Sequence, residues 1–289
     1  MNTKAALLKK HGRESDFVSK QISRILLIVL VIINIYPLLF TLITSLKTAD
    51  EFYGDIWSLP SRFYIGNYIN AFVQGHIGEY FFNSIAIAAF SLLIGTAFGT
   101  LAAYALARLK VPFVEAIVAL LIIVQILPTE SVIMPLYIFM SKLRLINIIY
   151  MPITLAYIGW LLPGTIVILK NFFQTIPVEL LESARMDGSG ELNTMLRIIM
   201  PLTKGALATC MVLNFCFVWG ELMWAQIATL TSDRGIPLTV GLLNFQGQYT
   251  TDWGLMTAAI CMILIPLFVT FVFTQKYFVE GLTAGAVKG

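Results

Sequence analysis

The sequence predicts an all-α membrane protein with six transmembrane helices, both termini in the cytoplasm, and a cytoplasmic helix-turn-helix loop. Three observations support this prediction. Hydrophobic residues make up 58% of the 289 residues and charged residues only 12%, too little polar material to cover a soluble globule. Long stretches without any charge recur along the chain. Most Lys and Arg residues fall in alternate connecting segments, as in membrane proteins with a fixed orientation.

The charge-free stretches locate the spans, because a helix needs about 20 apolar residues to cross the hydrocarbon core. Four stretches reach that length directly: 25–46, 80–107, 145–169 and 253–275. A fifth span is expected at 205–225, because the stretch after Lys204 meets its first charge at Glu221. The remaining span is expected near 114–133, followed by an interfacial segment, because Glu130 divides two apolar runs there.

These spans define the domain organisation. The segments are a cytoplasmic N-terminal segment at 1–24, the first span at 25–46, an external loop at 47–80, a core transmembrane domain at 81–275 that includes a cytoplasmic loop at 171–204, and a cytoplasmic tail at 276–289. With the N-terminus inside, 14 of the 19 Lys and Arg residues lie in inside segments, which fixes the expected orientation. The first span lacks a small-residue cleavage site, so we expect an uncleaved anchor.

Helix packing can also be anticipated. Gly95, Gly99 and Ala103 recur every four residues in the second span, a spacing that lets two helices approach closely. This ladder is expected to serve ordinary packing within the chain or a contact with a second subunit. Prolines such as Pro128 and Pro163 predict kinked helices.

Several function classes find no support in the sequence. There is no Gly-Lys dipeptide, so the phosphate-binding loop GxxxxGK[ST] of an ATPase is absent. His11 and His76 are isolated, and no metal site is expected. The cysteines Cys210, Cys216 and Cys261 lie in apolar stretches and are odd in number, which favours neither disulfides nor a thiolate metal site. The net charge of +3 is spread over separate loops, so nucleic acid is not an expected partner.

The loop between the fourth and fifth spans carries the most regular polar pattern. Thr175 and Pro177 fit a helix start, Glu179 and Glu182 place negative charge near it, and Gly188 suits a helix end. The first helix of the loop is therefore expected from about 177 to 187.

A second short helix should follow. Its apolar residues fall at i, i+3, i+4 and i+7, namely Leu192, Met195, Leu196 and Ile199, and Pro201 is expected to end it. The pair fits an amphipathic hairpin on the membrane surface, and it equally fits a rigid knob that receives movement from a partner.

This loop resembles the EAA loop of binding-protein-dependent ABC importer permeases, whose pattern is Glu-Ala-Ala, three residues, Gly, nine residues, Ile, one residue, Leu-Pro. Here it reads Glu182-Ser183-Ala184, then Gly188, Ile198 and Met200-Pro201, with conservative departures at Ser183 and Met200. In that family the first helix docks into a cleft of a separate ATPase subunit. The resemblance implies an ATPase-coupling role for Glu179, Glu182, Ser183, Ala184, Asp187, Gly188, Ile198 and Pro201.

The C-terminal sequence QKYFVEGLTAGAVKG resembles the signature of maltose-type, carbohydrate-uptake permeases. The resemblance implies a type I ABC importer permease fold in a bacterial cytoplasmic membrane, surrounded by lipid. It also implies a heterodimer with a second permease subunit, an ATPase dimer that holds ATP and Mg²⁺, and an extracellular or periplasmic sugar-binding protein. This chain is not expected to be an enzyme or to hold a cofactor. By the same resemblance, the tail residues Gly281, Gly285 and Gly289 are expected to contact the ATPase dimer.

A path for a sugar would need aromatic faces and hydrogen-bonding side chains, and the outer half of the fifth span offers Asn214, Trp219, Glu221 and Trp224. Glu221 fits either the substrate path or an anchor in an interfacial aromatic belt. In maltose-type permeases the loop before the last span reaches into the binding protein. The corresponding residues here are Asn244, Gln246, Gly247 and Gln248.

Three rival functions stay open. One is an ABC permease for a non-sugar solute, such as a glycerophosphate-type or polyol compound. An ion-coupled secondary carrier usually needs ionisable groups in mid-membrane, whereas Glu130 and Glu221 are expected near outer ends. A membrane-embedded enzyme needs a convergent nucleophile, base or metal set, and none is visible.

Overall fold

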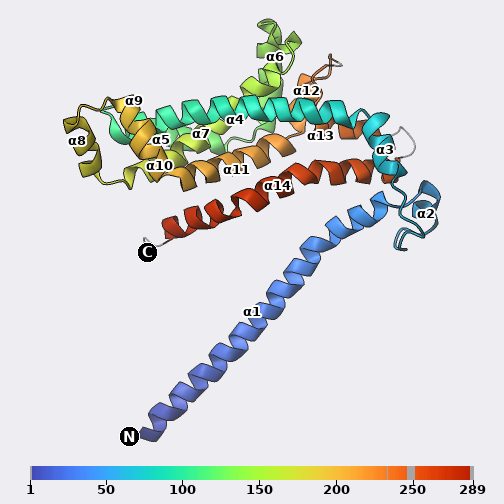
Figure 1. Ribbon diagram of the computed structural model, residues 1–289, viewed down its shortest axis with the longest axis horizontal. Coiled ribbons are helices and arrows are strands. Elements are labelled where there is room, and N and C mark those ends of the chain that lie inside the picture. The colour runs from blue at the N-terminus through green and yellow to red at the C-terminus, as the bar shows by residue number, and fades with distance from the viewer. Residues whose placement is uncertain (1, 233, 246–250, 287–289) are drawn as a thin grey trace.

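The computed structural model describes residues 2–232, 234–245 and 251–286, and its helices form an elongated bundle (Figure 1). The all-α prediction is thereby confirmed. In chain order the elements are α1 (Asn2–Ser45), α2 (Ala49–Gly54), α3 (Gly66–Val73), α4 (Ile77–Arg108), α5 (Val114–Ile126), α6 (Glu130–Lys142), η1 (Leu145–Asn147), α7 (Met151–Gln174), α8 (Val178–Met186), α9 (Glu191–Thr194), η2 (Met195–Ile199), α10 (Met200–Leu202), α11 (Lys204–Gly220), α12 (Met223–Ala228), α13 (Leu238–Gly241), η3 (Leu242–Phe245) and α14 (Trp253–Ala286).

Four helical segments are long and apolar enough to cross a membrane unaided: Lys20–Ser45 of α1, all of α4 and α7, and Trp253–Lys276 of α14. Two further crossings exist if each bent helix pair forms one span. In these pairs, α6 bends away from α5 by 102°, and α11 lies at 82° to the short helices before it. The six expected spans therefore correspond to four unbroken helices, α1, α4, α7 and α14, and to α5 and α11.

The third span is shorter than the expected 114–133, because α5 ends at Ile126. Leu127 has an extended backbone (ψ 127°), as expected of a residue that precedes a proline, and Pro128 cannot donate a helical hydrogen bond. The chain resumes as α6, which projects from the side of the bundle (Figure 1). This helix occupies the place of the expected interfacial segment.

The fourth span is shifted along the chain relative to the expected 145–169. Leu145–Asn147 form one 3₁₀ turn, and the helix α7 starts only at Met151. Tyr150 precedes it with a positive φ of 62°, a conformation that interrupts a helix, and Pro152 lies in the first turn, where its missing N–H is tolerated.

Helices α4 and α7 form the centre of the bundle. The small-residue ladder of α4 faces α7, since a Cβ added at Gly99 would lie 2.7 Å from Cγ2 of Thr165, and one at Gly95 would meet Leu161 at 3.6 Å. The ladder is therefore a packing contact within this chain, one of the two expected alternatives. Around α4 and α7, α11 and α14 complete the bundle (Figure 1).

The helix α1 leaves the bundle at an angle, and only the C-terminal end of α1 meets α14 (Figure 1). None of the most apolar 18-residue stretch within Lys20–Ser45 is buried in this chain. Apolar side chains exposed over such a length require lipid or another protein around them. The helix also extends back to Asn2, so the expected N-terminal segment at 1–24 continues the first span.

Candidate functional site

The helix α8, at one end of the bundle, ends in a defined stop. Gly188 has a φ of +80°, the left-handed conformation that glycine adopts without a Cβ penalty. The N–H of Ser189 donates to the carbonyl of Ala184 (2.9 Å), and the N–H of Gly188 donates to that of Arg185 (3.0 Å). This pair of bonds is the Schellman motif, which closes a helix and reverses the chain. Gly188 thus lies at the helix end that the sequence predicts.

Two faces of α8 have opposite environments. Leu181 and Ala184 are buried, and Leu181 belongs to a cluster with Phe173 of α7 and Tyr104 of α4. The opposite face is exposed and carries four of the expected coupling residues, Glu179, Glu182, Ser183 and Asp187, with Gly188 beyond them. Met186 projects from this face with 88% of its surface exposed. The helix therefore offers a mixed acidic and apolar surface on a packed base.

The residue Ser183 stands at the second position of the Glu-Ala-Ala pattern, in place of its first alanine. Its hydroxyl donates to the carbonyl of Glu179 one turn earlier (2.8 Å), so its polar group is satisfied inside the helix. The hydroxyl of Ser183 is therefore not free to bond a partner, and the side chain resembles an alanine in what it offers at the exposed face of α8. The departure from the pattern leaves that face unchanged.

The second helix of the loop is less regular than the sequence predicts. Met195 and Ile199 are buried, but Leu192 and Leu196 are 60% and 50% exposed, so only half of the expected apolar face is covered. Residues Met195–Ile199 form a π-helical turn, which rotates the following residues away from the 3.6-residue period.

Proline 201 lies inside the last short helix rather than ending the segment, which continues to Leu202. It cannot donate the usual bond to the residue four positions earlier, which accounts for a widened turn before it. Ile198 is half-buried and Pro201 is exposed, so neither belongs to the exposed face of α8.

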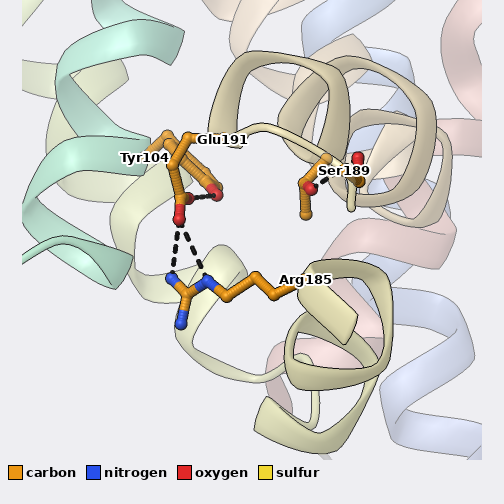
Figure 2. A network of polar contacts seen from close by, with 5 residues as sticks. Tyr104, Arg185, Ser189 and Glu191 are labelled. Carbon is orange, nitrogen blue, oxygen red and sulfur yellow. Dashed lines mark hydrogen bonds and ion pairs between the residues drawn. The ribbon is translucent and has the colours of Figure 1, made fainter. Parts of the chain in front are cut away.

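Three side chains connect α8, α9 and α4 (Figure 2). Arg185 and Glu191 form an ion pair, with Nη2 and Nε of Arg185 2.9 and 3.0 Å from Oε1 of Glu191. The hydroxyl of Tyr104 donates to Oε2 of the same carboxylate at 2.5 Å. This hydrogen bond and, to a lesser degree, Arg185 hold the pKa of Glu191 below its ordinary value. Both helices of the loop are thus tied to the end of α4.

The last turn of α4 also holds the start of the loop. The guanidinium of Arg108 donates to the carbonyls of Phe173 and Ile176, at the point where α7 ends. A cation at a helix C-terminus satisfies carbonyls that lack partners in the helix and interacts favourably with its dipole. Arg108 therefore connects α4 to the start of the loop and Tyr104 connects it to the second helix of the loop, a connection that sequence reasoning missed.

A second candidate site is a cavity of about 350 Å³ between α5, α7 and α11. Asn214 is the one member of the expected sugar path that lines it. Its other lining residues include Gln125, Trp160, Thr165 and Phe217, none of which is among the residues predicted from the sequence.

The other expected path residues lie in the packed core. Trp219 and Trp224 are buried, and their indole N–H groups donate to the carbonyls of Ile263 and Pro152, both at 3.1 Å. Neither tryptophan lines the cavity.

The carboxylate of Glu221 caps the helix α12. Its oxygens accept hydrogen bonds from the backbone N–H groups of Trp224 (2.8 Å) and Ala225 (3.1 Å) and from the hydroxyl of Tyr157 (2.7 Å). A side chain that accepts the free N–H groups of a helix start stabilises that helix. Each oxygen of Glu221 thus has protein partners.

The remaining predicted site residues lie at the two ends of the bundle. Asn244 is exposed, and its amide donates to the hydroxyl of Tyr80 of α4 (3.0 Å). Gln246, Gly247 and Gln248 lie outside the described residues. Gly281 and Gly285 belong to α14, which reaches Ala286 at the same end of the bundle as α8 (Figure 1), and Gly289 is outside the described residues.

Comparisons with known proteins agree with this architecture. Residues 95–281 match the family described as "Binding-protein-dependent transport system inner membrane component". The melibiose/raffinose/stachyose import permease protein MelC of Bacillus subtilis (strain 168) is 34% identical over 94% of this chain and 98% of its own length. The sulfoquinovosyl glycerol transport system permease protein SmoH of Agrobacterium fabrum (strain C58 / ATCC 33970) is 31% identical over 96% of this chain and 97% of its own length.

The fold is also that of a solved transporter. A crystal structure of a bacterial ABC transporter involved in the import of the acidic polysaccharide alginate contains a chain that superposes with a TM-score of 0.78. The superposition covers 91% of this chain and 98% of the transporter chain, and the two sequences are 22% identical. The resemblance drawn from the loop and the tail is confirmed, and the chain belongs to the binding-protein-dependent family of ABC transporter permeases, multi-pass proteins of the cell membrane.

Proposed function

We propose that this permease imports a carbohydrate, driven by a separate ATPase dimer and supplied by an external sugar-binding protein. The names of two relatives support the substrate class, since MelC is named for melibiose, raffinose and stachyose and SmoH for sulfoquinovosyl glycerol. ATP and Mg²⁺ would be held by the ATPase, because this sequence has no phosphate-binding loop. A second permease subunit would cover the apolar surface that α1 leaves exposed.

The observation that carries this proposal is the exposed face of α8 on a packed, hydrogen-bonded base. A surface that transmits force needs a rigid connection to the spans, because a floppy loop would absorb the motion. Here Leu181 and Ala184 anchor α8 from below, and the Tyr104–Glu191 bond connects the loop to α4. Closure of the ATPase dimer would then move α4 and α7 together and switch the bundle between inward-open and outward-open states.

The tail of α14 supports a second ATPase contact. A helix of 34 residues is about 50 Å long, whereas the hydrocarbon core is about 30 Å thick. The part of α14 beyond Lys276, which includes Gly281 and Gly285, would therefore extend past the membrane at the α8 end. At the opposite end, Asn244 and the residues that follow it are proposed to contact the sugar-binding protein.

The test uses the assembled transporter, purified through a tag on this chain and reconstituted in proteoliposomes. Glu182→Lys should reduce ATP-driven sugar uptake by about tenfold or more, because it reverses a charge on the face that meets the ATPase. Glu115→Lys is the matched control, since Glu115 is also exposed and lies at the first turn of α5, outside the loop. Equal uptake by the two variants would contradict the coupling role, and uptake that follows an ion gradient without ATP would favour a secondary carrier.

A further inference from the structure

We propose that the cavity between α5, α7 and α11 is a carbohydrate contact site in this subunit itself. In this site Gln125 and Asn214 would hydrogen-bond sugar hydroxyls, and Trp160 with Phe217 would pack against the ring. The inference rests on the proposed function, and it adds that this chain, and not only its partner subunit, contacts the cargo.

The cavity lies deep in the membrane. Its floor is the middle of α7, at Pro163 and Gly164, and its walls are the end of α5 and the part of α11 from Cys210 to Phe217. With a rise of 1.5 Å per residue, Gly164 is about 20 Å from the start of α7, beyond the midpoint of a 30 Å core. A volume of about 350 Å³ falls at the lower end of the range for ligand pockets, about 300–1,000 Å³. It accommodates one part of an oligosaccharide.

The amide of Gln125 on α5 lacks a polar environment unless the cavity holds water or a ligand. The helix is otherwise apolar after its first turn, and an amide in contact with hydrocarbon is costly. Its one described hydrogen bond runs from Nε2 to the carbonyl of Leu121 in the same helix (3.2 Å). A Cβ added at Gly164 would lie 3.3 Å from Oε1 of Gln125, so this glycine leaves the amide oxygen accessible.

Asn214 is fixed in place on the opposite wall. Its Nδ2 donates to Oγ1 of Thr165 on α7 (2.9 Å), and Thr165 is itself buried against Gly99 of α4. No described contact uses Oδ1 of Asn214, which remains available to accept a hydrogen bond from a hydroxyl. The cavity thus presents two amides from two helices, one of them held by a buried partner.

The aromatic pair supplies the apolar surface. The rings of Trp160 and Phe217 are 6.2 Å apart at 89°, and Trp160 also meets the buried Trp224 edge to face at 6.3 Å. These contacts hold the indole in one orientation beside the amides. Apolar lining with a few placed polar groups is typical of small-molecule sites. A lipid chain would use the rings but leave both amides unpaired, so sugar fits the lining better.

The first experiment measures access of water to the cavity in the assembled transporter. In a version of this chain without its three cysteines, Gln125→Cys and Asn214→Cys should react with a hydrophilic methanethiosulfonate about tenfold faster than Ile123→Cys. Ile123 is exposed on α5 but does not line the cavity. Excess raffinose, maltose or diacetylchitobiose, whichever the complex transports, should slow the reaction at both cavity positions. Equal rates at all three positions would show a lipid-filled or protein-filled cavity and overturn the proposal.

The second experiment measures transport. Gln125→Leu combined with Asn214→Leu should lower the maximal uptake rate about tenfold, while the KM for the loaded binding protein and the binding-protein-stimulated ATPase activity stay near wild type. Cys216→Ala, an exposed change on α11 outside the cavity, serves as control. Wild-type uptake in the double variant would refute the sugar contact but leave the proposed function intact. Failure of the unmodified complex to use ATP for sugar uptake would instead refute the proposed function.

Discussion

The hydroxyl of Tyr104 lies 2.5 Å from Oε2 of Glu191, and this bond joins the C-terminal end of α4 to the second helix of the loop at 171–204, the proposed coupling loop. The N-terminal end of the same helix is bonded as well. Asn83 donates to the carbonyl of Ile236 (2.9 Å), and the hydroxyl of Ser84 accepts from the N–H of Leu238 (2.7 Å). A single helix of 32 residues thus contacts both the coupling loop and the loop that precedes the last span. Motion of α4 would therefore move both of these loops.

Removing the hydroxyl of Tyr104 should weaken the coupling between the ATPase and the transmembrane helices without dissociating the complex. We expect Tyr104→Phe to keep the ring packed against Phe173, and therefore to keep assembly, while ATPase stimulation by the loaded binding protein falls several-fold. The same loss should appear in Glu191→Gln, and the two changes combined should cost less than their sum, because each removes the same bond. Stimulated ATPase activity at fixed complex concentration is the measurement.

The control for this pair is Tyr137→Phe, which removes the hydroxyl of a half-buried tyrosine on α6, a helix that projects from the bundle away from α8 and α9 (Figure 1). It should leave stimulation unchanged. Additive losses in the Tyr104 and Glu191 double variant would show that the two residues act separately, against the proposed link.

The Arg185–Glu191–Tyr104 network should also have a defined pH dependence. Because the pKa of Glu191 is lowered from its ordinary 4.5, its stabilisation is fully present above that value and is lost as pH falls through the lower folded-state pKa. The contribution is small, about 0.2–1 kcal/mol, since both charged side chains are nearly half exposed. Melting temperatures of wild type and Glu191→Gln should differ by a constant amount from pH 5.5 to 8 and converge in acid, as measured by thermal scans. A difference that grows with acidity would contradict this.

Much of this architecture can be predicted from the sequence, because a helix that crosses the hydrocarbon core must be a long stretch without charged residues. Charge-free stretches reveal the straight spans α4, α7 and α14, and the glycine at position 188 marks the turn of the coupling loop. The break after α5 was harder to place. Pro128 predicts a kink, but the 102° bend depends on where α6 packs, which local sequence does not specify.

The site was predicted only where a contiguous motif marks it. The exposed residues Glu179, Glu182 and Ser183 follow from the loop pattern, whereas Tyr104 and Glu191 are far apart in sequence and meet only through packing of α4 on the loop. The membrane cavity is similar, since Gln125 and Asn214 belong to different helices. One signal for Gln125 did exist, because it is the single amide in an apolar helix.

Ser183→Ala should be nearly silent. The hydroxyl of Ser183 bonds only within α8, so the change restores the family pattern without altering the exposed face. By contrast, Ala184→Leu should reduce expression or uptake strongly, because Ala184 is buried against the packed base and overpacking costs about 1–3 kcal/mol. Uptake and detergent-extracted yield of both variants check the pair. A harmful Ser183→Ala would mean that the hydroxyl contacts the ATPase directly.

Met186 should contribute to binding of the ATPase. It is an apolar side chain with 88% exposure beside Glu182 and Ser183, and a flexible thioether fills irregular clefts well. We expect Met186→Ala to weaken ATPase association by about 1–2 kcal/mol, roughly tenfold in Kd. Leu192→Ala is the matched control, since Leu192 is 60% exposed at the start of α9. Binding of purified ATPase to the permease pair in nanodiscs gives both affinities, and equal losses would remove Met186 from the contact.

Glu221 should prove structural, because both oxygens of its carboxylate are already occupied by α12 and Tyr157. Glu221→Ala leaves two backbone N–H groups and the buried hydroxyl of Tyr157 without their acceptor, at a cost of about 1–3 kcal/mol for each group that stays dry. Glu221→Gln keeps one acceptor oxygen and should fall between alanine and wild type in melting temperature. Tyr157→Phe, which removes the donor instead, should destabilise less than Glu221→Ala. Uptake per folded complex should stay near wild type in Glu221→Gln. Abolished uptake in that variant at an unchanged melting temperature would instead place Glu221 on the transport path.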